Sequence, residues 1–396
     1  MIWYPYEQMK TMHTPYKILD AQGVYLRTED QTLIDSISSW WCVIHGYKHP
    51  ELTAAIQAQA GRFCHVMLGG LTHQPVEDLA ARLQAFLPGD LDHCFFSDSG
   101  SVGVEVALKM ALQYNTNQGR KRPLVLALEH AYHGDTFRAM EVGDDEDYHF
   151  AFDQKQGVIH IPTEIPALEA AFQAYHDQLN SFLVEPLLQG AGGMRMYDLP
   201  FLERARQLCD RYDVLLIFDE VATGFGRTGH RFVADRVLPD ILVLGKALTG
   251  GYIGHAATVA NHKVFQAFYS DDPRRALMHG PTFMGNALAC AAACKGIEIF
   301  ERENYMAKIQ RIEAISRREM AAFTDPRIKE VRIMGGCTCV EVYDPKTLEG
   351  FQQFAYQRGV FSRPFLSYLY SMVPYVIQEE ELVQIFDTMK AWFRRG

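Results

Sequence analysis

The sequence predicts an α/β protein that has a mostly parallel sheet between helices and a second, smaller α+β domain. The first observation is two runs of branched apolar residues, Val214–Phe218 and Ile241–Leu244. Runs of four or five such residues are typical of strands that are buried on both faces of a parallel sheet. The second observation is that such segments alternate with amphipathic helical patterns, which indicates a doubly wound sheet.

The segments of the predicted large domain follow one another in a regular order. The expected strands are Asp92–Phe96, Leu124–Leu128, Phe182–Pro186, Val214–Phe218 and Ile241–Leu244. Helices are expected at about Val102–Tyr114 and at Phe201–Tyr212, and the first of these carries an apolar stripe at helical spacing. We therefore expect the apolar face of this helix to pack on the sheet.

After about Glu301 the pattern changes to that of a smaller α+β unit. The expected elements are a helix at Met306–Phe323, strands at Glu330–Met334 and Thr338–Tyr343, and helices near Leu348–Arg358 and Glu380–Arg394. The N-terminal segment is expected to join this unit through a hairpin of Gly23–Arg27 and Gln31–Ile34. The predicted division is residues 1–40 and 303–396 for the small domain and residues 41–302 for the large one.

Composition and charge exclude several classes of protein. The 396 residues exceed one ordinary core, and 48% hydrophobic with 22% charged residues is typical of a soluble globular protein. A net charge of −10 without a long basic block argues against nucleic-acid binding. No apolar run reaches the roughly 20 residues that a membrane-spanning helix needs.

The N-terminal residues and the cysteines indicate the cellular compartment of the protein. The first residues lack the basic and apolar regions of a secretory signal. The eight cysteines form no double Cys-x-x-Cys pattern, so we expect reduced thiols and no metal site. The sequence therefore predicts a cytoplasmic protein that binds neither nucleic acid nor membranes.

An acid and a lysine follow the two most apolar strands. Asp219 follows Phe218 directly, and Lys246 stands two residues after Leu244. The carboxyl ends of parallel strands meet at the edge where open α/β sheets hold ligands. A helix or turn cap and a solvated strand terminus are the ordinary alternatives for these two residues. Pyridoxal phosphate (PLP), however, needs a lysine for its Schiff base and a carboxylate for its pyridinium nitrogen.

A third feature suits the same ligand. Ser99-Gly100-Ser101 lies between an expected strand and an expected helix, where free backbone N–H groups favour an anion such as a phosphate. An ordinary N-cap is the alternative reading of this segment alone. Because all three features fit one ligand, the sequence predicts a PLP site.

Three other motifs do not predict the sites that they usually mark. Gly224–Gly229 matches G-x-G-x-x-G, but no clear helix begins inside it and Thr249 stands about where a dinucleotide site needs an acid. We therefore expect a glycine-rich active-site loop there. The run that ends at Asp219 resembles a Walker B strand, but the chain has no P-loop motif. A zinc site at His45 and His49 is disfavoured because Gly46 and Pro50 prevent a helix.

Longer motifs resemble the class III (ornithine-type) aminotransferases of PLP fold type I, and the similarity runs nearly end to end. The motifs are Asp35–Trp41, His45–Tyr47, Phe96–Val102, Ala131–Thr136, Gln189–Met194, Asp219–Gly229, Gly245–Gly251 and His279–Asn286. The Asp-Glu and Gly-Lys motifs mark the whole family. Ser-Ser-Trp-Trp, His-Gly-Pro-Thr-Phe-Met-Gly-Asn and Arg-Pro-Phe narrow the resemblance to the branch that serves biotin biosynthesis.

The resemblance implies how PLP is held. Lys246 would form the Schiff base and move the proton, Asp219 would pair with the pyridinium nitrogen, and Tyr132 would pack against the cofactor ring. Gly100 and Ser101 would hold the phosphate. They would be joined by Pro281 and Thr282 from the partner subunit of a homodimer, whose active sites lie at the subunit interface.

The resemblance also implies a substrate pocket. Its lining would consist of Tyr6, Trp40, Asp135, Gly280, Arg363 and Tyr370. Arg363 would bind the carboxylate of the keto acid, because its planar guanidinium matches that group. Asp135 would support Tyr6 at the entrance to the site.

The implied reaction is a ping-pong transamination. S-adenosylmethionine would donate the amino group, and 7-keto-8-aminopelargonate (8-amino-7-oxononanoate) would become 7,8-diaminopelargonate. Lysine as the donor is one alternative, and a class III enzyme for ornithine, 4-aminobutyrate or a polyamine is another. A non-catalytic protein that has kept the fold is the third, and the presence of both Lys246 and Asp219 argues against it.

Overall fold

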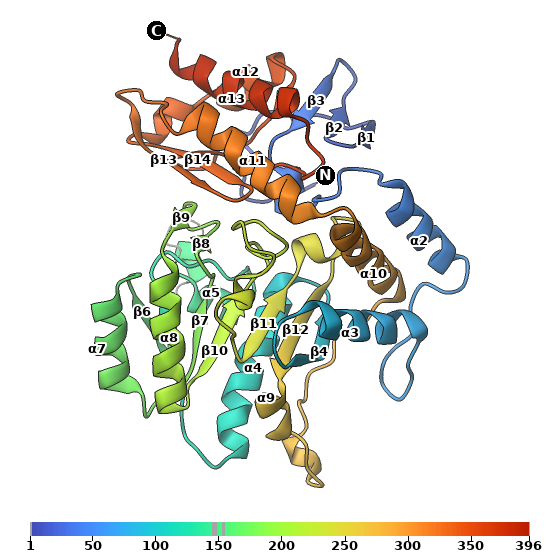
Figure 1. Cartoon of the computed structure of the whole chain (residues 1–396), viewed down its shortest axis with the longest axis vertical. Coiled ribbons are helices and arrows are strands. Elements are labelled where there is room, and N and C mark those ends of the chain that lie inside the picture. The colour runs from blue at the N-terminus through green and yellow to red at the C-terminus, as the bar shows by residue number, and fades with distance from the viewer. Residues whose placement is uncertain (1, 145–148, 153–154, 396) are drawn as a thin grey trace.

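A computed structural model describes residues 2–144, 149–152 and 155–395, which form a large lobe and a smaller one above it (Figure 1). The large lobe contains a seven-stranded sheet with the order β4-β12-β11-β10-β7-β5-β6. Its strands are β4 (Leu91–Ser97), β5 (Leu124–Leu128), β6 (Val158–Ile161), β7 (Leu179–Val184), β10 (Leu215–Asp219), β11 (Ile241–Leu244) and β12 (Ala256–Asn261). Only β12 of these seven runs antiparallel to its neighbours, so the prediction of a mostly parallel sheet is confirmed.

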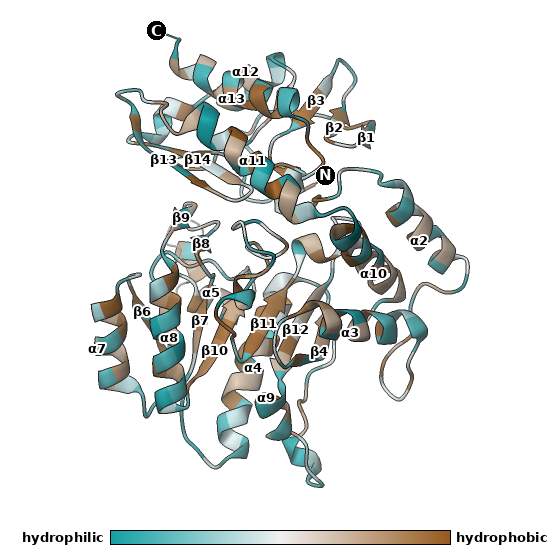
Figure 2. Cartoon of the chain, in the orientation of Figure 1, coloured by the Kyte–Doolittle hydropathy of each residue, from teal (hydrophilic) through white to brown (hydrophobic). Residues whose placement is uncertain are grey.

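The sheet has a hydrophobic layer on each face, and alternate residues of a strand enter opposite layers. Leu215 and Ile217 of β10 pack with residues of helix α4 (Gly100–Asn117). Leu216 and Phe218 pack in the other cluster, together with residues of α8 (Leu199–Tyr212). Burial on both faces explains why these strands are apolar throughout, as the hydropathy colours of Figure 2 show.

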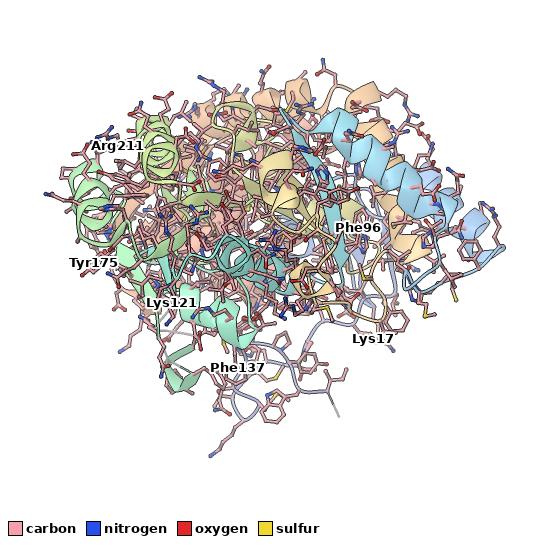
Figure 3. The ribbon with its side chains drawn as sticks, turned by 90° about the horizontal axis from the view of Figure 1, so that it is seen from below. Lys17, Phe96, Lys121, Phe137, Tyr175 and Arg211 are labelled. Atoms are coloured by element: carbon pink, nitrogen blue, oxygen red, sulfur yellow. The ribbon has the colours of Figure 1, made fainter. Side chains whose placement is uncertain are left out.

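The helices of the large lobe surround this sheet. Besides α4 and α8 they are α2 (Pro50–Ala60), α3 (Gln74–Phe86), α5 (Phe137–Val142), α7 (Ile165–Tyr175), α9 (His262–Gln266) and α10 (Ala287–Arg302). Several start with proline in the first turn, where its missing N–H costs no hydrogen bond. Seen from below, α7 and α8 lie side by side near the labelled Tyr175 and Arg211 (Figure 3).

The small lobe combines distant parts of the chain. Its elements are the sheet β13 (Ile328–Met334), β14 (Cys337–Val342) and β16 (Tyr368–Ser371), the sheet β1 (Asp20–Gln22), β2 (Tyr25–Arg27), β3 (Thr32–Asp35) and β15 (Val360–Phe361), and the helices α11 (Tyr305–Met320), α12 (Phe351–Gln357) and α13 (Glu379–Phe393). The expected hairpin is β2 and β3, and β3 pairs in parallel with β15. The N-terminal segment and the C-terminal part of the chain thus share one sheet. The predicted domain boundaries at residues 40 and 302 stay a proposal.

The remaining elements are short. They are α1 (Ser38–Trp41), the strand pair β8 (Leu188–Gln189) and β9 (Arg195–Met196), and the 3-10 helices η1 (Phe150–Phe152), η2 (Val233–Asp235), η3 (Lys246–Thr249), η4 (Pro273–Arg275) and η5 (Pro345–Leu348). Across the ranges described above, no helix combines the length and the apolar character needed to cross a membrane.

Candidate active site

A cavity of about 480 Å³ is lined by residues of both lobes. Seven of the site residues that the sequence predicts line it: Tyr6, Trp40, Tyr132, Asp135, Lys246, Arg363 and Tyr370. Seven further residues complete the lining: Glu7, Trp41, Ala191, Gln352, Pro364, Phe365 and Leu366. The carboxyl-end edge of the sheet contributes Lys246, whereas Arg363 and Tyr370 come from the small lobe, so the cavity joins the two lobes.

Lys246 follows β11 and is the first residue of η3, with a left-handed φ of 42°. Its Nζ lies 4.5 Å from the centre of the Trp41 ring. Burial lowers the pKa of Lys246, and the nearby carboxylates of Asp219 and Glu185 only partly offset this effect. A lowered pKa leaves more of the neutral amine, which is the form that attacks an aldehyde.

Asp219 ends β10 and is 4% exposed. Its Oδ2 lies 2.8 Å from Nδ1 of the buried His133, and its Oδ1 accepts the backbone N–H of Val221 at 3.1 Å. An ionised carboxylate only accepts hydrogen bonds, so the proton of this His133 contact belongs to Nδ1. Both oxygens of Asp219 are therefore held in place, and the carboxylate has a fixed orientation.

The start of α4 is the turn that the sequence predicts to bind an anion. The Ser99 hydroxyl oxygen accepts the backbone N–H of Val102 at 3.3 Å, so Ser99 is the N-cap and Gly100 is the first helical residue. A Cβ on Gly100 would lie 2.7 Å from Cγ1 of Val221, which explains why glycine stands here. Ser101 Oγ accepts the backbone N–H of Asp135 at 3.1 Å. The first-turn N–H groups of such a helix favour an anion.

Asp135 is the centre of a hydrogen-bonded cluster at one side of the cavity. Its Oδ1 accepts the hydroxyl of Tyr6 at 2.5 Å, the hydroxyl of Tyr132 at 3.0 Å and Nε2 of His149 at 3.1 Å. Burial raises the pKa of Asp135, but the hydrogen bonds from these three residues outweigh burial and lower it overall. Burial also raises the pKa of the Tyr132 hydroxyl, which therefore keeps its proton and donates.

Glu185 lies behind this cluster and was not among the predicted site residues. Its carboxylate accepts the backbone N–H of Tyr132 at 3.0 Å and that of Gly190 at 2.9 Å. Burial raises the pKa of Glu185 to about 7, so this carboxyl titrates near neutrality. It sets the position of the Tyr132 backbone and adds a carboxyl group close to Lys246.

The paired tryptophans lie on a left-handed turn. All four residues of α1, Ser38 to Trp41, have positive φ values between 42° and 75°. For L-amino acids this conformation costs about 1–2 kcal/mol per residue, so the surroundings must enforce it. The buried Asp35 carboxylate accepts the N–H groups of Ile37 at 2.9 Å and Ser39 at 3.0 Å. The turn brings both rings, Trp40 and Trp41, to the cavity.

Arg227 holds the same turn from the opposite side. It is 1% exposed, and its Nη2 donates to Ser38 Oγ at 2.8 Å and to the Trp41 carbonyl at 3.0 Å. This arginine belongs to the glycine-rich segment Gly224–Gly229, which forms a loop as expected. None of its residues lines the cavity, however, so the loop supports the active site from behind instead of forming its wall.

Arg363 is paired with a carboxylate of its own chain. Its Nη2 donates to Glu7 Oε1 at 2.9 Å, and its guanidinium carbon lies 5.6 Å from the centre of the Trp40 ring. Arg363 therefore binds a carboxylate of its own chain, and its role towards the carboxylate of the keto acid stays a prediction. No sequence pattern identified Glu7, because its partner lies 356 residues away in the chain.

Gly280, Pro281 and Thr282 are not part of the cavity in this subunit. They lie between η4 and α10, where Gly280 and Thr282 are exposed and the Thr282 carbonyl lies 2.8 Å from His65 Nε2. Their predicted roles thus stay predictions, which for Pro281 and Thr282 concern the partner's site. In the part of the chain that the structure describes, no group of three or more His, Cys, Asp and Glu side chains is placed to hold a metal.

The residues present fit PLP. A buried lysine with a lowered pKa, a fixed buried carboxylate and a helix start with a close-packed glycine supply the three kinds of contact that this cofactor needs. Gly100, Ser101 and Asp219 do not themselves line the cavity, but Ser101 is bonded to Asp135, and Asp219 acts on Lys246 through its charge.

The family model and the most similar relatives identify the same protein family. The family described as aminotransferase class-III matches residues 6–393. The chain is 40% identical to the adenosylmethionine-8-amino-7-oxononanoate aminotransferase of Corynebacterium glutamicum, over 98% of this chain and 96% of that protein. It is 38% identical to the protein of the same name from Saccharomyces cerevisiae, over 97% and 92% respectively.

Solved structures agree with these relatives. A crystal structure of adenosylmethionine-8-amino-7-oxononanoate aminotransferase from Methanocaldococcus jannaschii is 31% identical, with a TM-score of 0.95 over 100% of this chain and 97% of the other. An amine transaminase from an uncultivated Pseudomonas species, solved in its PLP-bound form, is 27% identical, with a TM-score of 0.89 over 100% and 98%.

Proposed function

Because this chain belongs to the class III aminotransferase family and is a PLP-dependent aminotransferase, we propose that it makes 7,8-diaminopelargonate for biotin biosynthesis. In this proposal S-adenosylmethionine donates the amino group and 8-amino-7-oxononanoate accepts it. The observation that carries the proposal is the near full-length similarity to relatives whose name includes both molecules, at 38% and 40% identity. The cavity supports it, since it has an amine at Lys246, a guanidinium at Arg363 and aromatic walls.

The contacts within the proposed cofactor site support a role for each of its residues. When bound, PLP supplies the electron sink that stabilises a carbanion at the carbon that bears the amine. The Asp219 carboxylate, oriented by His133, keeps a proton on the pyridine nitrogen. Lys246 Nζ takes the proton from the donor carbon and delivers a proton on the return path, which is general acid–base work at one atom. Gly100 and Ser101 hold the phosphate at the start of α4.

The substrate end of the cavity suits a long chain with a terminal carboxylate. Trp40, Trp41 and Tyr370 provide apolar walls for the methylene groups, and polar groups are needed only at the ends. Arg363 binds the carboxylate of the acceptor in a charge-assisted contact. The faces of Tyr6 and Trp40 attract the sulfonium of the donor by cation–π interaction.

We also propose a cytoplasmic homodimer with active sites at the subunit interface. The exposed segment that contains Gly280, Pro281 and Thr282 supports this assembly, because it lies outside the cavity of its own subunit. In the dimer, Pro281 and Thr282 complete the phosphate site of the partner.

The decisive experiment separates the two half-reactions. PLP-loaded protein is mixed with S-adenosylmethionine, and loss of the yellow cofactor absorption is followed. Addition of 8-amino-7-oxononanoate then restores the absorption with formation of 7,8-diaminopelargonate. Lysine, ornithine, 4-aminobutyrate and a polyamine are tested as donors in parallel. Bleaching by one of these, with no bleaching by S-adenosylmethionine, overturns the proposed donor.

A further inference from the structure

The N-terminal segment places two consecutive side chains in the wall of the active-site cavity. Tyr6 donates to Asp135 at 2.5 Å, and Glu7 accepts from Arg363 at 2.9 Å. Tyr6 adopts a left-handed φ of 55°, which turns the chain between the two contacts. Glu7 is thus positioned by a residue that is itself anchored in the site.

The Glu7–Arg363 ion pair also lies in the wall between two cavities. A second cavity of about 810 Å³ lies beneath residues 4–18. Four residues line both this outer cavity and the active-site cavity: Glu7, Trp40, Gln352 and Arg363. The Glu7 side chain therefore borders open space in both cavities.

We propose that Glu7 is a specificity-determining residue whose carboxylate occupies Arg363 until the substrate carboxylate displaces it into the outer cavity. This inference rests on the proposed function, since it takes the acceptor to be an amino-keto acid with a terminal carboxylate. Glu7 makes its contact through Nη2 of the guanidinium. A substrate carboxylate that binds both prongs of the guanidinium makes two charge-assisted hydrogen bonds and so displaces Glu7.

The exposure of the pair makes this exchange feasible. The side chains of Arg363 and Glu7 are 22% and 35% exposed, and partly exposed ion pairs are weak. Glu7 therefore compensates the charge of Arg363 without blocking it. When a bound molecule has no carboxylate next to Arg363, Glu7 keeps its ion pair with the guanidinium. The aromatic cavity then contains no unpaired positive charge. The chain thereby distinguishes molecules by a carboxylate at one end.

The proposal is tested by binding of a probe that does not react. Nonanoate carries the terminal carboxylate and the methylene chain but no amine or ketone, and nonanamide is its neutral counterpart. Titration calorimetry with PLP-loaded protein measures the affinity for each of these two probes. We expect Glu7→Gln to bind nonanoate about 2- to 5-fold more tightly than the unaltered protein, because the competing charge is gone, and to bind nonanamide equally.

Glu29→Gln is the matched control. Glu29 also lies in the N-terminal part of the chain, and its exposed ion pair with Lys17 is 3.5 Å long. This variant also removes one negative charge, but at a position that has no contact with Arg363, so its affinity for nonanoate should not change. Glu7→Asp, which draws the carboxylate back by one methylene, should give an intermediate gain. Retained PLP absorption verifies that each variant is folded.

Two results would overturn the inference. One is that Glu7→Gln binds nonanoate no more tightly than the unaltered protein, and the other is that neither protein binds nonanoate. The calorimetric result is independent of turnover, so it is distinguishable from failure of the proposed function, which appears as absence of transamination with S-adenosylmethionine and 8-amino-7-oxononanoate.

Discussion

His133 Nδ1 donates to Asp219 Oδ2 at 2.8 Å, and both side chains are buried. The two residues lie 86 positions apart, on the loop after β5 and at the end of β10. A buried carboxylate without a donor pays a desolvation cost, so His133 both stabilises the charge of Asp219 and fixes its direction.

Replacement of His133 by Ala should therefore impair the cofactor site without removing the lysine. Loss of a hydrogen bond to a charged group costs about 1.5–3 kcal/mol, so we expect roughly a 10- to 100-fold fall in kcat/KM. His133→Asn, which keeps a side-chain N–H donor, should recover part of the loss. Steady-state kinetics and PLP titration measure the effect, and full activity of His133→Ala would remove His133 from the site.

Lys246→Ala should abolish the covalent link to the cofactor. The purified variant should lack the yellow Schiff-base absorption, and its transamination rate should fall by at least roughly 10²- to 10⁴-fold, the usual contribution of acid–base catalysis. Absorption spectroscopy and single-turnover kinetics measure these changes. A yellow variant would show that another lysine carries the cofactor.

Arg363→Ala should separate substrate binding from cofactor binding. Because the arginine contributes a charge-assisted contact worth about 1.5–3 kcal/mol, we expect the KM for the keto acid to rise roughly 10- to 100-fold. PLP loading should be unchanged, since Arg363 is paired with Glu7 and the predicted cofactor contacts lie elsewhere. Loss of PLP from this variant would contradict the assigned role.

The capture of PLP by cofactor-free protein should depend on pH through Lys246. Only the neutral amine reacts, and burial lowers the pKa of Lys246, so the rate should rise with pH and level off below the ordinary lysine pKa of about 10.4. The Asp219 carboxylate acts in the opposite direction and raises this pKa. Asp219→Asn should accordingly shift the rate profile to lower pH, which stopped-flow absorption between pH 6 and 10 measures.

Arg227→Lys should loosen the tryptophan turn. Lysine keeps the charge but cannot reproduce the contacts of the guanidinium with Ser38, Trp41 and the Val373 carbonyl. We expect a loss of about 1–3 kcal/mol in the free energy of unfolding, since buried polar groups are left unpaired. Urea unfolding measures it, and a change in tryptophan fluorescence of the native state should accompany it. An unaltered midpoint would mean that Asp35 alone holds the turn.

Sequence patterns predicted most accurately the strands that consist of a continuous apolar run. β5 and β11 have the bounds that were expected, because continuous apolar runs end abruptly there. β7 begins earlier and ends earlier than Phe182–Pro186, since its first residues include the polar Asn180 and Ser181. β6 was not expected because it is only partly buried, and β12 was not expected because its alanines have weak strand preference.

The predicted cofactor residues were accessible to sequence reasoning because they lie at strand ends. Lys246 and Asp219 stand out as ionisable residues just after apolar runs. Glu7, Glu185 and Arg227 have no such signal, since each acts through a partner that only the fold brings near. Glu185 lay near the end of the expected strand Phe182–Pro186, and it directly follows β7 in the structure, so this position was the one available hint.

The pairing of β3 with β15 has a consequence for how the enzyme is made on the ribosome. The strands of the large lobe emerge in succession, whereas β3 must wait for a partner that is translated after all of them. During that interval β3 presents an unpaired edge, which is a target for chaperones or for aggregation. Newly made chains should thus acquire the wall that carries Arg363 after the large lobe, and catalytic competence should follow the pairing of β15 with β3.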